Sequence, residues 1–192
     1  MPALKRTKAG RIAGLFVSSA GSAIKQPAGQ LTLTFAGALD DGHSGITRPA
    51  GVREPAFKRG HEIANMRQLS LVSTEELADA ASLMGVARID PGWIAANIAI
   101  EGAGPITQFP SGTIIRFQPS QASIYVTGLN TPCTFAAKLI AKAGRYPAAD
   151  TASFVRHATG RRGLVGIVYA AGVISVGDSV EAIFAQPELP GP

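Results

Sequence analysis

Residues 113–127, TIIRFQPSQASIYVT, decide the class of fold. Two runs rich in β-branched and aromatic residues, Thr113–Gln118 and Ala122–Thr127, flank the turn residues Pro119 and Ser120. Such runs favour strands, and a short connection of turn residues between them is typical of neighbouring antiparallel strands. The stretch therefore predicts two paired β-strands.

The same strand signature recurs on both sides of this stretch. Within Leu31–Phe35, leucine and phenylalanine alternate with threonine, the period-two pattern of a half-buried strand. Further strands are expected at Arg11–Ser18, Ile63–Val72, Leu164–Ala170, Val173–Val176 and Ser179–Phe184. Helices are expected after the capping box Ser73-Thr74-Glu75-Glu76, over Phe135–Ala143 and from about residue 149 to residue 158.

Strands thus outnumber helices, and short turns connect most of them. This pattern predicts a mainly β fold, an antiparallel β-barrel with a few peripheral α-helices. The barrel is expected to include Leu31–Phe35, the two strands of residues 113–127 and the C-terminal strands of residues 164–184.

The length of 192 residues and the apolar content of 46% suit one well-filled core. We expect a single domain over residues 1–192, with its core at about 11–184, a loose basic arm at 1–10 and a Pro-rich tail at 186–192.

One cysteine excludes an internal disulfide and agrees with a reducing compartment. No long apolar run follows the basic stretch Lys5–Arg11, and the uncharged stretch Gly163–Gly177 is too short to span a bilayer. We therefore expect a soluble, cytoplasmic protein without a membrane segment.

The formal net charge of +5 attracts anionic ligands. Nucleic acid is one such ligand, but aromatic residues make up only 6% of the chain, and no strand interleaves basic with aromatic residues. No helix-turn-helix or zinc-finger spacing is present either. A small anionic ligand is therefore expected rather than nucleic acid.

The single cysteine lies at the expected start of a helix. Thr131 is a suitable N-cap and Pro132 suits the first helical position, which places the Cys133 sulfur among unpaired N–H groups. A helix N-terminus stabilises the thiolate, which is both a nucleophile and a soft metal ligand. The alternative interpretation is a small buried hydrophobic residue.

Other polar residues have two interpretations each. Asp41 and His43 lie in a Gly-rich and Asp-rich loop, which is either a ligand loop or an ordinary turn. Arg67 and Gln68 lie in the middle of the expected strand Ile63–Val72, where one of two successive side chains must face inward. An inward arginine needs an anionic partner, whereas an outward one is simply solvated.

An ordered set of short motifs resembles the MOSC domain. The set is Asp41-Gly42-His43-Ser44-Gly45, Arg67-Gln68-Leu69-Ser70, Pro91-Gly92 with Asn97-Ile98, Pro110-Ser111-Gly112-Thr113, Pro132-Cys133, and Gly163, Gly172 and Val176-Gly177-Asp178-Ser179-Val180. This module occurs at the C-terminus of molybdenum-cofactor sulfurases, in amidoxime-reducing proteins and as free-standing bacterial proteins. No aminotransferase-like desulfurase domain accompanies it here, so the chain resembles the stand-alone type.

The resemblance implies a MOSC-like barrel that binds molybdenum cofactor, an anionic phosphorylated pterin. By position, Cys133 matches the family cysteine that accepts sulfur or ligates molybdenum, and Asp41 and His43 match the family's acidic-histidine loop. Further cofactor-binding positions are implied at Arg67, Gln68, Asn97 and Arg162, and Arg67 or the Arg161-Arg162 pair is suited to the phosphate. Many members have Gly-Glu-Asn where this chain has Ala95-Ala96-Asn97, so a carboxylate for acid/base chemistry is missing at that position.

Two functions follow from the resemblance. One is an enzyme or sulfur-transfer module in which Cys133 carries sulfur to molybdenum, or ligates the metal during reduction of an N-hydroxylated compound, with a sulfur-donor or redox protein as partner. The other is a non-catalytic carrier of the cofactor. Pyridoxal phosphate is linked to the family through its fused sulfurases, and no Schiff-base lysine is expected in this chain.

Overall fold

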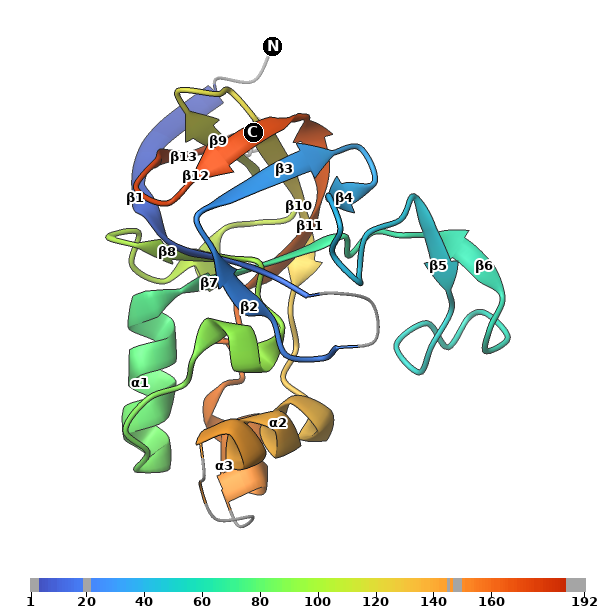
Figure 1. The fold of residues 1–192 in the computed structure, drawn as a ribbon, viewed down its shortest axis with the longest axis vertical. Coiled ribbons are helices and arrows are strands. Elements are labelled where there is room, and N and C mark those ends of the chain that lie inside the picture. Colours follow the sequence, from blue (N-terminus) through green and yellow to red (C-terminus); the bar gives the residue numbers. More distant parts are fainter. Residues whose placement is uncertain (1–3, 19–21, 145, 147–149, 186–192) are drawn as a thin grey trace, which may run out of the picture.

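The computed structural model describes residues 4–18, 22–144, 146 and 150–185, and a closed β-barrel forms its centre (Figure 1). In sheet order the barrel strands are β13 (Ser179–Ala185), β9 (Ile114–Gln118), β10 (Ser123–Leu129), β11 (Leu164–Ala170), β7 (Leu69–Ser73), β8 (Ile98–Glu101) and β1 (Leu4–Val17). β1 pairs back with β13 and closes the ring, and β2 (Gln26–Ala28) adds to β1 outside it. All of these pairs are antiparallel except β7 with β8. The predicted mainly β barrel is confirmed.

β1 is longer than the sequence suggested. Its first half pairs with β13, from Leu4 opposite Ala185 to Arg11 opposite Ser179, and its second half pairs with β8. The expected loose arm at residues 1–10 is therefore wrong from Leu4 onward. The partner strand lies more than 160 residues away in sequence, and local composition carries no trace of that pairing. The expected tail at 186–192 lies outside the described residues.

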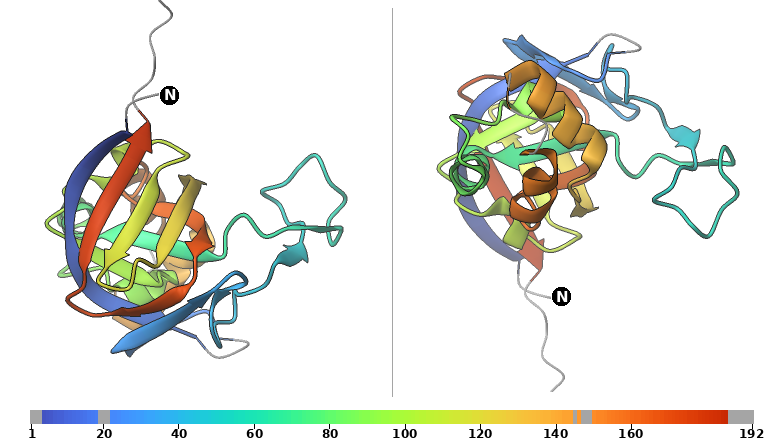
Figure 2. Two further views of the ribbon diagram at one scale, coloured as in Figure 1. Left: turned by 90° about the horizontal axis from the view of Figure 1, so that it is seen from above. Right: turned by 90° about the horizontal axis from the view of Figure 1, so that it is seen from below.

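Two smaller sheets accompany the barrel. One consists of β12 (Gly172–Ser175), β3 (Gln30–Thr34) and β4 (Gly37–Ala38), and the other of β5 (Thr47–Pro49) and β6 (Glu62–Ala64). The expected strand at Leu31–Phe35 is thus real as β3, but it belongs to the first of these sheets and not to the barrel. The segment from Thr47 to Ala64, here called the β5–β6 lobe, projects sideways from the barrel (Figures 1 and 2).

Buried side chains form two clusters. The first fills the barrel and includes Ile12, Leu15, Leu69, Leu71, Ile98, Ile100, Ile115, Phe117, Ile124, Val126, Leu164 and Val180. The second lies under the helices α1 (Thr74–Met84), α2 (Thr134–Gly144) and α3 (Asp150–His157) and the 3₁₀ turn η1 (Pro91–Ile94), which gather at one end of the barrel (Figure 1). A further 3₁₀ turn, η2 (Ile106–Gln108), follows β8.

The predicted cap of α1 is half right. Ser73 Oγ accepts the N–H of Glu76 at 3.2 Å, as an N-cap should. The Glu76 carboxylate accepts from Thr107 instead of returning to the cap, and Ser73 Oγ donates to Glu75 at 2.7 Å. None of the described helices has the length and hydropathy needed to cross a membrane.

Candidate functional site

A polar pocket of about 230 Å³ lies where the connections between barrel strands converge. Its described lining is Lys25, His43, Arg53, Arg67, Gln68, Ser70, Ala95, Asn97, Asn130, Arg162 and Val165. Four of these side chains are basic and none of those described is a carboxylate. We call it the basic pocket, and its charge suits an anionic ligand.

Arg162 is, with Lys25, one of two buried cations that line the basic pocket. It lies between α3 and β11 with 6% of its surface exposed, and its guanidinium donates to the Ile94 carbonyl and, at 3.5 Å, to Ser70 Oγ. Burial lowers its pKa to about 10, and the charge of Cys133 acts in the opposite direction. Arg162 forms no ion pair with a described residue. A buried guanidinium without a carboxylate partner is costly, and an anionic ligand would relieve that cost.

Gly163 lets the chain carry Arg162 into the site. Its φ is +87°, and a Cβ there would lie 1.9 Å from the Leu71 carbonyl oxygen. We expect Gly163→Ala to lower the free energy of unfolding by about 3 kcal/mol, combining overpacking with left-handed strain. Gly160→Ala is the matched control, because its φ is +73° and no atom lies within 4 Å of the added Cβ. Urea unfolding should show a much smaller loss for the control, and equal losses would contradict the close approach.

Arg67 and Gln68 lie in the turn between β6 and β7, so their expected place in the middle of a strand is wrong. The turn is held by Asn65, whose side chain accepts from Arg67 N at 3.2 Å and donates to the carbonyls of His43 and Gly45. These side-chain bonds to the backbone compete with strand pairing. Arg67 Nη2 donates to Asn130 Oδ1 at 2.9 Å, and this half-buried arginine lines the basic pocket.

Gln68 mainly stabilises the fold through hydrogen bonds to the backbone. Its amide nitrogen donates to the Phe35 carbonyl at 2.9 Å, and its oxygen accepts from Val168 N at 3.0 Å. The side chain is buried and ties the β3–β4 connection to β11. It lines the basic pocket, but both ends of its amide are already occupied.

Asp41 lies behind the basic pocket and organises it. Both carboxylate oxygens lie 2.9 Å from Lys25 Nζ, and they also accept from Ser18 N at 3.1 Å, His43 N at 3.0 Å and Asn97 Nδ2 at 3.3 Å. Burial alone would raise the pKa of Asp41, but the hydrogen bonds from His43 and the charge of Lys25 outweigh it and lower that pKa below its usual range. Asp41 therefore holds the pocket-lining residues in place and is not among the described lining residues itself.

His43 and Asn97 contact this carboxylate in different ways. The His43 side chain is 52% exposed, lines the basic pocket and places Nδ1 3.4 Å from Asp41. Asn97 is buried, accepts from Ser70 N at 3.1 Å and donates to the Phe16 carbonyl at 3.3 Å. Its amide thus links β1, β7 and the Asp41 loop.

Cys133 lies beside the basic pocket. α2 begins at Thr134, and the Cys133 carbonyl accepts from Ala137 N at 3.1 Å, so Cys133 occupies the N-cap position. The predicted N-cap at Thr131 is wrong by two residues. Cys133 is half-buried, packs against the cluster under the helices and lies close enough to Arg162 and Arg67 to interact with their charges. Cys133 is not among the described residues that line the pocket.

Sequence reasoning missed Lys25 and Asn130. Lys25 lies in a Gly-, Pro- and Ser-rich segment and is almost fully buried only because Gly92 approaches its backbone, where Lys25 N donates to Gly92 O at 3.0 Å. Asn130 bridges Arg67 and Ser70 through its amide. Neither has a local signal, although Asn130 lies three residues after the end of the predicted strand Ala122–Thr127 and directly after the observed β10.

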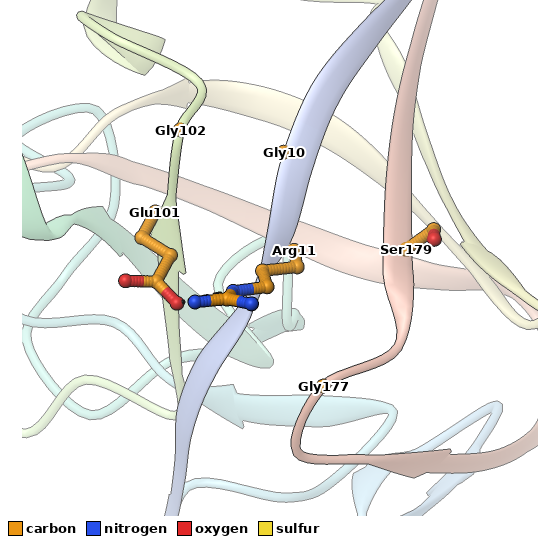
Figure 3. A pocket seen from close by; sticks show the side chains of 6 residues that line it. All are labelled: Gly10, Arg11, Glu101, Gly102, Gly177 and Ser179. Carbon is orange, nitrogen blue, oxygen red and sulfur yellow. Dashed lines mark hydrogen bonds and ion pairs between the residues drawn. The ribbon is translucent and has the colours of Figure 1, made fainter.

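Another cavity, of about 620 Å³, lies at β1, β8 and β13 and shares no described lining residue with the basic pocket. Figure 3 shows Arg11 and Glu101 in it, with Arg11 Nε 2.5 Å from the carboxylate. This exposed ion pair satisfies its own charges. Among the described residues, no group of three or more His, Cys, Asp or Glu side chains could hold a metal ion.

The closed barrel with its polar pocket and adjacent cysteine defines a class of protein. A model of the MOSC domain family matches residues 58–181, and the chain belongs to this family. It is 40% identical over 170 residues, 88% of this chain and 87% of the relative, to YuaD of Bacillus subtilis (strain 168), whose name places it among metal-sulfur cluster biosynthesis proteins.

Solved structures agree with this assignment. The crystal structure of Bacillus subtilis YuaD matches with a TM-score of 0.91 and 38% identity, covering 96% of this chain and 100% of that one. YiiM from Escherichia coli matches with a TM-score of 0.56 and 20% identity, covering 93% of this chain and 72% of that one. At that identity the likeness to YiiM shows the fold alone.

Proposed function

We propose that this MOSC protein binds molybdenum cofactor in the basic pocket and uses Cys133 to carry sulfur or to ligate molybdenum. The observation that supports it most is Arg162, a buried guanidinium that faces the pocket without a carboxylate partner among the described residues. The family's association with this cofactor adds support.

The residues present fit such a group. Arg162, Arg67 and Arg53 would hold a phosphate through charge-assisted hydrogen bonds, and Lys25 adds a fourth cation at the pocket wall. A second pocket of about 210 Å³ shares Asn130 and Arg162 with the first and is also lined by Pro132, next to Cys133. The anion-binding Arg162 and the residue that precedes Cys133 therefore line the same pocket.

The chain's own residues would bind and orient a substrate and move a proton. The bound cofactor would supply the redox-active metal. Reduction of an N-hydroxyl group consumes two electrons and two protons and releases water, and a redox partner protein would supply the electrons. His43 is the described titratable lining residue that is exposed and lies beside a carboxylate, so it is the proposed proton donor.

A carrier without catalysis is the second proposal. It is favoured by Ala96, which stands where many family members have a glutamate, and by Gln68 and Asn97, whose amides are already hydrogen-bonded. A carrier would need the basic pocket but no reactive thiol.

Arg162→Met tests the shared step, cofactor binding. Protein made in a host that produces molybdenum cofactor should contain molybdenum and pterin, and Arg162→Met should bind the cofactor at least about tenfold more weakly, as expected for a lost charged hydrogen bond. Arg161→Met is the matched control, because Arg161 bonds the His157 carbonyl and does not line the basic pocket. Metal analysis and pterin fluorescence give the readout. Native protein without either component, or equal contents in both variants, would contradict the proposal.

A further inference from the structure

A groove of about 490 Å³ lies between the barrel and the β5–β6 lobe. Its described lining is Arg48, Glu54, Phe57, Ile63, Ala64, Met66, Arg67, Thr127, Gly128, Leu129 and Val165. Arg67 and Val165 also line the basic pocket, so the groove and the pocket adjoin at these residues. The lobe that forms its outer wall is the part of the fold that projects from the barrel in Figures 1 and 2.

The walls of the groove are largely apolar. Phe57, Met66 and Leu129 are 49%, 46% and 52% exposed, although single exposed hydrophobic residues are ordinary on a protein surface. Here they gather around one concave space with Ile63, and Phe57 is held by stacking on His61 at 5.7 Å between ring centroids. A concave apolar surface beside a few polar groups is typical of small-molecule sites.

Positive charges outnumber negative ones at the end of the groove next to the basic pocket. Arg48 and Glu54 form an ion pair that also fastens the lobe, because Glu54 accepts from Gly51 N at 2.9 Å. Arg67 and Arg53 form no ion pair with a described residue, although Glu54 lies close enough for its charge to act on Arg67. Arg53 reaches from the lobe to the Thr131 carbonyl at 3.3 Å. Two guanidiniums and one carboxylate thus line the groove, and Arg53 in the adjoining basic pocket adds a further positive charge, which favours an anionic group at Arg67.

We propose that the groove binds a small amphipathic molecule, with a flat apolar body against the lobe and an anionic end at Arg67. Its volume lies within the roughly 300–1,000 Å³ of small-molecule pockets. The inference rests on the proposed function only in naming this molecule the substrate of the adjoining basic pocket. The lobe then selects the substrate, while the basic pocket holds the cofactor.

A pair of fluorescent probes tests the groove without any activity. 8-Anilinonaphthalene-1-sulfonate has a flat apolar body and an anionic end, and N-phenyl-1-naphthylamine is its neutral counterpart. Ala64→Trp should fill the groove and lower the affinity of the protein for both probes at least about tenfold. Leu83→Trp, on the exposed face of α1, should leave both affinities unchanged. Arg67→Gln should lower the affinity for the sulfonate probe about tenfold and leave the affinity for the neutral probe unchanged.

The outcomes separate this inference from the proposed function. Equal probe binding by Ala64→Trp, Leu83→Trp and native protein would overturn it, as would an Arg67→Gln variant that affects both probes alike or neither. Thermal unfolding would verify that each variant is folded. Molybdenum and pterin contents of Ala64→Trp should remain native. If the native protein binds the probes but no cofactor, the proposed groove is supported and the proposed function is contradicted.

Discussion

Replacing Asp41 with asparagine is expected to lower the free energy of unfolding by about 3–5 kcal/mol at neutral pH, the cost of breaking a buried ion pair from one side. Lys25 and Asp41 are both almost fully buried, so the variant would leave the ammonium without a counter-charge. The double variant Lys25→Met with Asp41→Asn should regain most of the loss, because no unpaired charge remains. Chemical denaturation of the three proteins measures these differences.

Asp40→Asn is the control for this experiment. Asp40 is exposed, its φ is +61°, and asparagine tolerates that conformation, so its stability should change little. A double variant as unstable as Asp41→Asn would show that the loss comes from the other hydrogen bonds of Asp41 and not from the charge of Lys25.

The same carboxylate sets a pH dependence of stability in the native protein. The pKa of Asp41 is lower in the folded protein than in the unfolded chain, where it is about 3.9. Its contribution is therefore fully present above that value and is lost as the pH falls toward the folded pKa. The free energy of unfolding of the Asp41→Asn variant should therefore fall less at acid pH than that of the native protein.

Cys133→Ser is expected to reduce turnover of an N-hydroxylated compound at least about a hundredfold, since even outer-shell partners of a metal site contribute about 10- to 100-fold. The pterin content should stay near native, because Arg162 and Arg67 and not the thiol would hold the phosphate. The assay uses protein produced with the cofactor and a chemical reductant. Thr134→Ser, one residue further along, is the control for disturbance at the start of α2.

Four results of experiments on Cys133 have distinct meanings. Turnover that depends on Cys133 supports the catalytic proposal. Cofactor binding without turnover in the native protein supports the carrier. Turnover that survives Cys133→Ser contradicts the role of the thiol, and failure of the native protein to react with an alkylating reagent before unfolding would return Cys133 to a small buried hydrophobic residue.

The strands were predictable because their signals are local. Alternation at β3 and the β-branched runs at β9 and β10 depend only on neighbouring residues, and each lies within a residue or two of its expected place. Which strands pair with one another was harder to predict from the sequence. β3 pairs with β12 about 140 residues away, and no period in either segment indicates whether they join the barrel or the smaller sheet beside it.

The site shows the same division. Of the residues that the family resemblance assigned to the site, Arg67 and His43 line the basic pocket, whereas Asp41 lies behind it and Cys133 beside it. Lys25 gave no signal, because its burial depends on contact with Gly92, a residue from a distant turn. Residue types could be assigned from motifs, but which side chains line a pocket depends on contacts between loops.

Closure of the barrel by β1 and β13 also orders events during synthesis. The first half of β1 has no barrel neighbour in the described chain except β13, which leaves the ribosome more than 160 residues later. Until then β1 presents an unpaired edge to other nascent chains, and the ring cannot close. The contact that closes the ring therefore joins segments more than 160 residues apart, and a contact of such sequence separation is one that slows folding.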